Sequence, residues 1–561
     1  MNIKKMVADS IELDVGVNFE DLITIIQEEG RGDYCIPCFS LAKVMRKAPI
    51  VIAEEIKASI SNEELFEKIE VVNGYLNFYL NKKYIIKSVM NEAVNNPNFY
   101  KDYEFMGKTM CIDYSSVNLA KYMHIGHLST TIIGESISRI HEAKGYNVVR
   151  INYIGDYGTP FGKMVYAYLS WGKKEELELR GVDYLQELYV EFCKRAEEDE
   201  KYEQEARKYF KLIEEKDEKI YPIYKEFIEI SKLEAKELLD VLGVKFDSWK
   251  GESAYTEALS DVVSQIDAKG LLTESEGAKI VDLEAYGKGC CLIQKSDGTS
   301  LYATRDIAAA IDRFNQYKFN KMLYVTAVQQ KLHFEQFFKV LDLMGYDFAK
   351  NLHHIYYGMF SLPTGKIASR RGKQAVLRDL MEYSYNKVLG IVEGRKFEFE
   401  TKENVAQKIA MSALKFNAIK NERIKDSVFD IENCFSFDGD TSAYMQYTYA
   451  RICSILRRAN TNVDHDKIDW DYLRGESVYN LAFHINLYNE TLNNAYKQNE
   501  PSILSKYALN LCKLFNKFYI AEKVITENKQ EVNAKIALLN VIKNTLKELF
   551  YVLCIDVIEE M

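Results

Sequence analysis

One segment limits the fold of this chain more than any other: residues 109 to 153 have the pattern of a strand, a loop, a helix and a second strand. Residues 109 to 114 are apolar and β-compatible, and residues 148 to 153 repeat that character. Between them, residues 127 to 143 place isoleucines at helical spacing and stop before Gly145, a residue type that commonly ends helices. This order predicts one unit of a parallel α/β sheet.

The loop before this helix carries two histidines, in the sequence His124-Ile125-Gly126-His127. A phosphate placed here would meet the positive end of the helix and its free backbone N–H groups. The imidazoles can donate hydrogen bonds as negative charge develops on phosphate oxygens, and the glycine lets a nucleotide come close to the backbone. Pairs of histidines also occur in loops by chance, so this pattern needs support from the rest of the chain.

The chain divides into three large regions with different patterns. Residues 1–95 mix helical and strand-like segments, and Asn96-Pro97-Asn98 follows as a candidate linker. Residues 100–385 carry the strand–helix alternation of a nucleotide-binding, Rossmann-like parallel sheet, interrupted at about 164–285 by a mostly helical insertion. From 390 to 561 one helical pattern follows another. We therefore predict an α/β catalytic domain with a helical insertion, between an α+β N-terminal domain and an all-α C-terminal domain.

Composition excludes several classes of protein. With 561 residues, of which 47% are hydrophobic and 28% charged, the chain has the composition of a soluble globular protein with three or four domains. It has no apolar run long enough to span a membrane and begins without the apolar core of a secretory signal, so we expect a cytoplasmic protein with no membrane partner. A formal net charge of −10 argues against indiscriminate coating of DNA or RNA, although a local basic surface can still bind an RNA.

Ten cysteines are spread along the chain, and only Cys35 and Cys38 have the spacing of a metal or redox pair. A structural zinc site normally needs a second such pair, and Cys290-Cys291 does not provide one. We expect reduced, buried thiols and no dedicated metal site.

Five further segments accompany the histidine pair and extend the pattern through most of the chain. They are Ser115-Ser116-Val117-Asn118-Leu119-Ala120-Lys121, Gly155-Asp156-Tyr157-Gly158-Thr159, Leu301-Tyr302-Ala303-Thr304-Arg305-Asp306-Ile307-Ala308-Ala309-Ala310, Gln330-Lys331-Leu332-His333-Phe334 and Gln446-Tyr447-Thr448-Tyr449-Ala450-Arg451. Together, and in this order, they resemble the arginyl-tRNA synthetases, a family of class I aminoacyl-tRNA synthetases. One departure is Tyr157, which stands where the family has tryptophan.

The resemblance implies a two-step reaction and its substrates. The carboxylate of L-arginine attacks the α-phosphate of ATP to give arginyl-adenylate and pyrophosphate, and the acyl group then passes to the 3′ end of tRNA(Arg). It also implies Mg²⁺ bound with ATP and a monomeric enzyme. Because the first step needs little proton transfer, the site should consist mainly of hydrogen-bond donors and cations that position the phosphates and stabilise their charge.

The ATP site implied by the resemblance combines two loops. The first contributes His124, Gly126 and His127, with Lys121 just before them. The second is Lys366-Ile367-Ala368-Ser369-Arg370-Arg371-Gly372-Lys373, which resembles the Lys-Met-Ser-Lys-Ser loop of class I synthetases in an altered form. Such a mobile basic loop can close over the triphosphate. The expected second lysine is missing, so we assign its role to Arg370, with Lys121 compensating, and we assign ATP contacts to Lys366 and Ser369. The structural alternative is an exposed basic turn.

Selection of arginine requires a buried carboxylate, because only a fork-shaped pairing with the planar guanidinium excludes lysine efficiently. Asp306 is the expected carboxylate, and Tyr302, one helical turn earlier, shares its face. The alternative for Asp306 is a structural salt bridge to Arg305 or Arg313.

The rest of the predicted arginine site contacts the remainder of the substrate. Gln330 is expected to add an amide contact, whereas Asn118 and Asp113 are expected to bind the α-amino end. Some family members have glutamate where this chain has Asp113.

Two regions are expected to contact tRNA. The C-terminal region resembles the anticodon-binding domain of several class I synthetases, and Tyr444, Gln446 and Arg451 open one of its helices. Aromatic rings can stack on splayed bases while arginines hold phosphates, although several of these tyrosines must belong to the core. The N-terminal region resembles the family's domain that reads the tRNA elbow. Tyr75 and Asn77, on one face of a strand-like segment at residues 70–80, are its expected contacts.

Three other functions compete with this one. A cysteinyl-tRNA synthetase shares the helical C-terminal architecture, but it needs zinc ligands for thiol selection. A small-molecule nucleotidylyltransferase uses the same histidine loop, but it usually lacks a long helical domain after the sheet. A catalytically dead paralogue would serve as an RNA-binding scaffold, whereas His124, His127 and Asp306 are all retained in this chain. The motifs therefore favour the arginyl enzyme.

Overall fold

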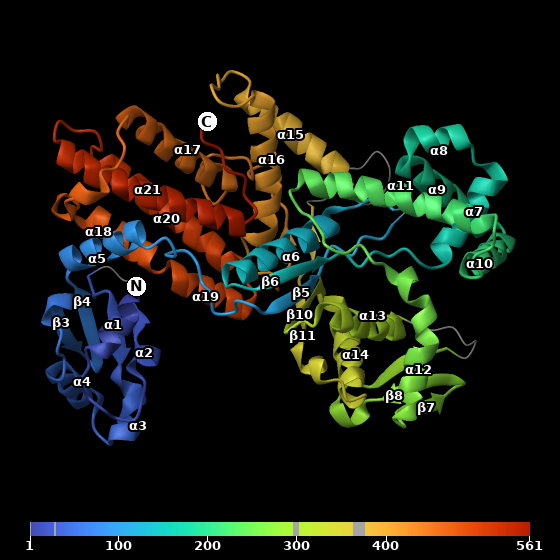
Figure 1. The fold of residues 1–561 in the computed structure, drawn as a ribbon, viewed down its shortest axis with the longest axis horizontal. Helices are drawn as coiled ribbons and strands as arrows, with labels where there is room; N and C mark the ends of the chain where they lie inside the picture. The colour runs from blue at the N-terminus through green and yellow to red at the C-terminus, as the bar shows by residue number, and fades with distance from the viewer. Residues whose placement is uncertain (1, 27–29, 120, 296–301, 363–375) are drawn as a thin grey trace.

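The computed structural model describes residues 2–26, 30–119, 121–295, 302–362 and 376–561, and a four-stranded parallel sheet lies at the centre of the molecule (Figure 1). Its strands have the order β11-β10-β5-β6. The strands and the helices that connect them are β5 (Thr109–Asp113), α6 (Ile125–Ala143), β6 (Asn147–Ile151), α13 (Tyr302–Tyr317), β10 (Lys321–Ala327), α14 (Lys331–Leu343) and β11 (Leu352–Tyr357).

Alternate residues of the central strands are buried on opposite faces of this sheet. In β5, Met110 and Ile112 join the core on the side of α6, whereas Cys111 joins the core formed with α13 and α14. Because both faces are covered, the strand is apolar on both sides, as is usual in parallel sheets. The predicted Rossmann-like sheet is confirmed.

The direction in which strands are added reverses between β5 and β10. The chain passes from β5 through α6 to β6 on one side, and it later returns to form β10 on the other side of β5. In open parallel sheets, ligands bind beyond the carboxyl ends of the strands at such a reversal. The fold therefore indicates a site at the ends of β5 and β10.

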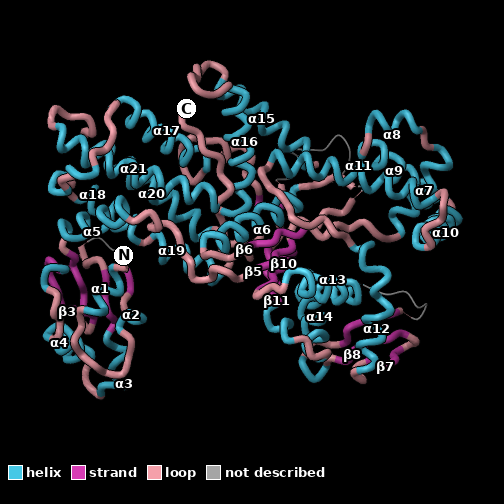
Figure 2. Tube along the Cα trace, in the orientation of Figure 1, coloured by secondary structure: helices cyan, strands magenta, loops and turns pink. Residues whose placement is uncertain are grey.

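The insertion lies between β6 and α13, and it is not entirely helical. Its helices are α7 (Thr159–Trp171), α8 (Lys174–Arg180), α9 (Val182–Glu198), α10 (Lys201–Glu214), α11 (Ile220–Val241) and α12 (Leu259–Ala268). An antiparallel sheet follows, formed by β7 (Leu272–Ser275), β8 (Ala278–Asp282) and β9 (Cys290–Gln294). Figure 2 shows β7 and β8 apart from the central strands. The prediction of a mostly helical insertion omitted this sheet because its strands are only four or five residues long and β7 is largely exposed.

The N-terminal region is a four-stranded antiparallel sheet with short helices. Its elements are α1 (Ile3–Asp9), α2 (Phe19–Leu22), β1 (Thr24–Ile25), β2 (Tyr34–Pro37), α3 (Ala42–Met45), α4 (Pro49–Ala58), β3 (Phe66–Val72), β4 (Tyr75–Leu80) and α5 (Lys82–Asn95). The single strand-like segment expected at residues 70–80 is a hairpin of β3 and β4. Its turn is Asn73-Gly74, both left-handed with φ of 50° and 83°, a dipeptide that favours this kind of turn.

The C-terminal region is helical, as predicted, and it contacts both other regions. Its elements are α15 (Leu377–Val392), α16 (Lys402–Ile419), α17 (Ser442–Ala459), α18 (Glu476–Asn486), α19 (Tyr488–Gln498), α20 (Ser502–Ala521) and α21 (Lys529–Val552), with a two-residue strand β13 (Ser427–Val428) that pairs with β12 (Phe360–Ser361). The Nε1 of Trp470 donates to Asn91 of α5 at 2.7 Å. None of the helices in the described ranges combines the length and apolar composition needed to cross a bilayer.

Candidate active site

A cavity of about 600 Å³ opens at the carboxyl ends of β5 and β10, where the strand order reverses. Eight of the residues selected from the sequence line it, although they come from segments far apart in the chain. These residues are Asp113, Asn118, His124, Gly126, His127, Tyr302, Asp306 and Gln330.

The two histidines of the loop form a reciprocal cap at the start of α6. The backbone N–H of Gly126 donates to Nδ1 of His124 at 3.1 Å, and the backbone N–H of His124 donates to Nδ1 of His127 at 3.1 Å. Burial lowers the pKa of His124, and burial together with the neighbouring His124 lowers the pKa of His127 to about 3. Both rings are therefore neutral near pH 7, with Nδ1 as acceptor, so each carries its proton on Nε2. The helix start thus presents two Nε2–H donors.

A strained turn follows β5 and lines the same cavity. Ser115 and Ser116 are left-handed, with φ of 71° and 47°, a conformation that costs a non-glycine residue about 1–3 kcal/mol. Thr131 of α6 donates its hydroxyl to Ser115 Oγ at 3.0 Å, and the hydroxyl of Ser116 donates to Asp113 at 3.4 Å. Contacts with the surrounding structure therefore hold the turn in this shape.

Asp113 is already paired with a buried cation. Its Oδ2 lies 2.8 Å from an Nη atom of Arg313, and both side chains are almost completely buried. Arg313 therefore balances the charge of Asp113, and the sequence alternative in which Arg313 pairs with Asp306 is not what the structure contains.

The carboxylate of Asp306 faces the cavity from the first turns of α13. Its partner is His333, whose Nε2 lies 2.6 Å from Asp306 Oδ2. Tyr302, one turn earlier, is 70% exposed at the cavity, and Arg305 stacks on Tyr157, with its guanidinium carbon 3.8 Å from the ring centre. The other sequence alternative, an Asp306–Arg305 bridge, is therefore absent as well.

A second carboxylate, Glu252, lines the cavity and was not selected from the sequence. It is the first residue of a 3₁₀ helix, Glu252–Ala258, in the insertion. Burial and then the charge of Asp306 raise its pKa to about 7, while Arg305 opposes that rise. No periodic pattern marks Glu252, and only its position directly after Gly251 in an irregular segment sets it apart. His333 was also overlooked as a site residue, although it lies in a motif that had been recognised.

Of four further residues predicted for the ATP site, the structure describes only Lys121. Lys121 is exposed, and its Nζ lies 5.4 Å from the ring centre of Tyr189 in the insertion, outside the lining of the main cavity. Lys366, Ser369 and Arg370 lie outside the described residues.

The predicted tRNA residues differ in exposure. Tyr75 is 43% exposed and packs edge-on against Phe39, whereas Asn77 is buried. Gln446 is fully buried and donates from Nε2 to Ser412 and to the backbone oxygen of Asp556, so its predicted contact with RNA is corrected to a role in the core. Gln446 lies where α17 packs against α16, the helix that carries Ser412.

The other two predicted anticodon-arm residues are partly exposed. Arg451 donates to Asn516 at 2.8 Å and to the hydroxyl of Tyr447 at 3.0 Å. Tyr444 accepts a hydrogen bond from the same Asn516 at 2.9 Å. The two side chains therefore share one anchoring residue at the surface of the helical region.

Gly155 provides a test of the prediction that Asn118 binds the α-amino end of arginine. A Cβ at this position would lie 2.4 Å from Asn118 Oδ1, so Gly155→Ala should displace the Asn118 side chain. Loss of one hydrogen bond to a charged group should raise the KM for arginine about tenfold, measured by aminoacylation kinetics. Gly390→Ala is the matched control, because a Cβ there meets nothing within 4 Å. An unchanged KM in Gly155→Ala would contradict the placement of Asn118.

Comparison with known proteins agrees with this geometry. Residues 89–431 match a family model described as "tRNA synthetases class I (R), catalytic domain". Residues 445–561 match the "DALR anticodon binding domain", and residues 1–80 match the "Arginyl tRNA synthetase N terminal domain".

Similar proteins and structures extend along the whole chain. The chain is 41% identical over 567 residues to an arginine–tRNA ligase of Clostridium botulinum (strain 657 / Type Ba4), covering all of both proteins. It is 40% identical over 535 residues to that of Alkaliphilus metalliredigens, covering 95% of this chain and 94% of that protein. Its fold is similar to arginyl-tRNA synthetase structures from Thermus thermophilus (TM-score 0.83, 22% identity, 100% and 99% of the two chains) and Plasmodium falciparum (TM-score 0.80, 27% identity, 96% and 94%). The chain therefore belongs to the arginyl-tRNA synthetases, the class I family of arginine–tRNA ligases.

Proposed function

We propose that the cavity activates L-arginine with ATP and that the chain then transfers arginine to the 3′ end of tRNA(Arg). The observation that carries this proposal is the meeting of two kinds of group in one cavity. Two Nε2–H donors at the start of α6 suit a phosphate chain, and the carboxylates of Asp306 and Glu252 suit a guanidinium.

The first step is proposed to proceed by direct displacement at phosphorus. A carboxylate oxygen of arginine bonds to the α-phosphorus of ATP, while the bond to the bridging oxygen breaks and pyrophosphate leaves with the electron pair. His124 and His127 donate to the phosphate oxygens as their negative charge grows. Lys366, Ser369 and Arg370 hold the outer phosphates. In the second step, a ribose hydroxyl of the tRNA attacks the acyl carbon and AMP leaves.

Arginine is proposed to lie with its guanidinium between Asp306 and Glu252. Two carboxylates on different elements can bind the two edges of the fork, which an ammonium cannot exploit in the same way. Tyr302 and Gln330 border this end of the cavity. Asn118 is proposed as the main contact of the α-amino group, because Asp113 at that end of the cavity is already paired with Arg313.

The pH dependence of arginine binding should expose Glu252. Its pKa of about 7 means that below pH 7 it is mostly protonated, and a guanidinium prefers the ionised form. Binding therefore strengthens as pH rises through 7, and the dissociation constant for arginine should be about tenfold higher at pH 6 than at pH 8. Isothermal titration calorimetry at several pH values measures this change.

Glu252→Gln is the control for this pH dependence. The variant should bind arginine weakly at pH 8, and its affinity should vary little between pH 6 and 8. If it kept the wild-type slope, another group would be responsible for the titration.

The tRNA is proposed to lie across two surfaces. Exposed Tyr75, backed by Phe39, contacts the elbow with Asn77 at its base, while Tyr444 and Arg451 contact the anticodon arm. Aromatic stacking and phosphate pairing supply the affinity.

Mg²⁺ is proposed to enter with ATP. Within the described ranges, no group of three or more histidine, cysteine, aspartate or glutamate side chains is placed to hold a metal, and Mg²⁺ is often held largely by substrate phosphates. We also propose a monomer in the cytoplasm. The ten cysteines are all free thiols, which suits a reducing compartment.

Charging of total tRNA with each of the twenty amino acids tests the proposed function. Only arginine should be esterified, and the product should be confined to tRNA(Arg). Efficient charging with cysteine or another amino acid, or no charging at all, would overturn the proposal.

A further inference from the structure

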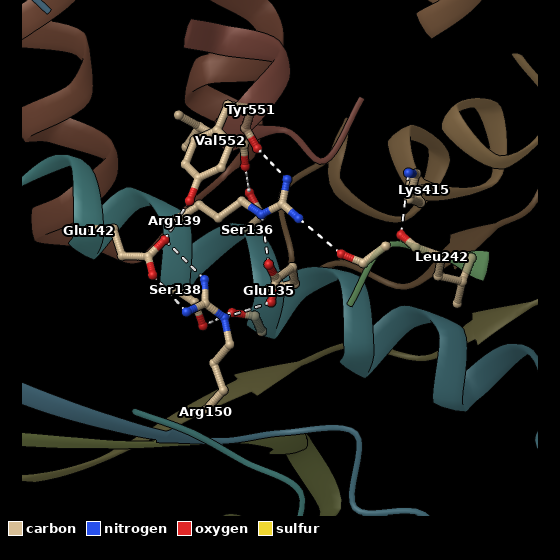
Figure 3. Close-up of polar contacts among 12 residues, drawn as sticks. Glu135, Ser136, Ser138, Arg139, Glu142, Arg150, Leu242, Lys415, Tyr551 and Val552 are labelled. Carbon is tan, nitrogen blue, oxygen red and sulfur yellow. Dashed lines mark hydrogen bonds and ion pairs between the residues drawn. The ribbon is translucent and has the colours of Figure 1, made fainter. Parts of the chain in front are cut away.

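Helix α6, which begins at the two histidines, is joined to the C-terminal helices by polar contacts at its other half (Figure 3). The hydroxyl of Ser136 donates to the backbone oxygen of Val552 at 2.8 Å, and Arg139 donates from Nη1 to the backbone oxygen of Tyr551 at 2.8 Å. Tyr551 and Val552 are the last two residues of α21. Carbonyl groups at a helix end have no partner within the helix, so side chains of α6 satisfy the end of α21.

Arg139 also joins α6 to the insertion. Its Nη2 donates to the backbone oxygen of Gly243, just after the end of α11, at 3.2 Å. Its guanidinium carbon lies 4.9 Å from the ring centre of Tyr551. One side chain therefore binds the ends of two helices, one from the insertion and one from the C-terminal region.

The third guanidinium nitrogen of Arg139, Nε, connects this residue to the part of α6 that is nearer the cavity. Its Nε donates to Glu135 at 2.7 Å, and the other oxygen of Glu135 accepts from Arg150 at 3.0 Å and from the hydroxyl of Tyr114 at 2.6 Å. Glu135 and Tyr114 are buried, so these charge-assisted bonds are shielded from water.

Tyr114 fixes the strained turn that lines the cavity. It directly precedes Ser115 and Ser116, whose left-handed conformations require support from their surroundings. Its side chain packs closely against Gly134 of α6, where an added Cβ would be 2.3 Å from the ring. The turn, α6 and the end of α21 are thus connected by consecutive direct contacts.

We propose that Arg139 is a positioning residue: through Glu135 and Tyr114, it sets the Ser115–Ser116 turn according to the placement of α21, so that binding of the tRNA anticodon arm by the C-terminal helices promotes reaction in the cavity. This inference rests on the proposed function. Coupling of this kind is measured as a free energy shared between the two sites.

The test compares two RNA substrates on wild-type protein and on Arg139→Lys. Lysine retains a charge for Glu135 but cannot reach two backbone oxygens with a fork of N–H groups. The substrates are full-length tRNA(Arg) and a minihelix of its acceptor and T arms, which lacks the anticodon arm. In Arg139→Lys we expect kcat for full-length tRNA to fall about 5- to 30-fold, with its Kd unchanged, while charging of the minihelix changes little.

Lys535→Met is the matched control. Lys535 is a buried cation on the same helix α21, paired with Glu531 four residues earlier at 2.8 Å and with Glu522 at 3.0 Å, so its ion pairs lie outside α6. This variant should lower thermal stability but leave the ratio of kcat values for the two RNAs at its wild-type value. Tyr114→Phe removes only the hydroxyl from the path and should reproduce part of the Arg139→Lys effect without unfolding the protein.

The outcomes separate the two hypotheses. The positioning role would be overturned if Arg139→Lys lowered kcat equally for both RNAs. It would also be overturned if only the Kd for tRNA changed, or if neither constant changed. If the wild type does not charge the minihelix, the test uses full-length tRNA alone: a lower kcat with an unchanged Kd supports the positioning role, and any other result contradicts it. Failure of the wild-type protein to charge tRNA(Arg) would instead count against the proposed function.

Discussion

Asp306→Ala should remove most of the ability to activate arginine. Truncating one partner of a buried charge pair costs about 2–5 kcal/mol, so kcat/KM for arginine should fall about 10²- to 10³-fold. The loss should appear mainly in the KM for arginine, because the guanidinium is bound both before and during the reaction. Arginine-dependent exchange of pyrophosphate into ATP, measured in the presence of tRNA, gives both constants.

Glu252, a neighbour of Asp306 in the cavity, limits the size of this loss. The charge of Asp306 helps to raise the pKa of Glu252, so its removal should lower that pKa and leave Glu252 ionised to bind the substrate alone. The residual activity should therefore be lost when Asp306→Ala is combined with Glu252→Gln.

Asp306→Ala has a matched control on the same helix. Asp312→Asn, on the same helix but outside the cavity lining, replaces a carboxylate that lies 2.7 Å from Lys250, and it should leave the KM for arginine unchanged. The Kd for ATP should stay near the wild-type value in both variants. A near-normal KM for arginine in Asp306→Ala would refute the assignment of the guanidinium site.

The central fold was predictable because its signals are local. A short continuous run of apolar, β-compatible residues in β5 and apolar residues at helical spacing in α6 identify the elements from short windows of sequence. The topology of a parallel sheet then places the carboxyl ends of β5 and β10 side by side. Residues far apart in the sequence, such as His124 and Asp306, could therefore be expected in one site. Motif resemblance supplied their roles.

The residues that were missed are those whose function depends on tertiary contacts. Glu252 lies in an irregular turn of the insertion, and nothing local shows that it faces Asp306 of α13. His333 lies in a recognised motif, but its pairing with Asp306 requires α13 and α14 to be packed together. Sequence patterns identify which face of a helix is polar, whereas they do not identify the partner of each polar group.

The wrong predictions have the same origin. Gln446 is polar on an otherwise suitable helix face, yet it satisfies a buried hydroxyl and a backbone carbonyl oxygen. Buried polar groups of this kind are almost always hydrogen-bonded, so polarity alone does not indicate exposure. The hairpin at Asn73-Gly74 was available from the sequence, because this dipeptide is a strong local turn signal.

The second large effect is expected at the histidine pair. His127→Asn should lower kcat for adenylate formation about 10²- to 10³-fold, the loss that follows removal of one donor to charge that develops in a transition state. The asparagine Oδ1 can still accept the hydrogen bond that Nδ1 accepts from the backbone N–H of His124, so the helix cap should survive. Thermal melting should show little change, whereas single-turnover kinetics should show the loss.

His127→Gln tests the complementary change, in which the donor is kept and the helix cap is lost. Its side-chain amide can reach the region of Nε2 and retain a donor, but it fits the cap poorly. We expect this variant to keep more activity and to lose more stability than His127→Asn. His353→Asn, at an exposed histidine on β11 outside the cavity lining, controls for loss of an imidazole.

The pH dependence of the first step distinguishes a neutral donor from a cation. Because the pKa of His127 is about 3, the ring stays neutral from pH 6 to pH 8 and its contribution to kcat should not change over that range. A cationic histidine would instead lose its effect as pH rises through its pKa. The ratio of wild-type to His127→Asn kcat should therefore be the same at pH 6 and pH 8. A ratio that collapses toward one at pH 8 would show that the imidazolium, and not a fixed Nε2–H donor, stabilises the phosphate.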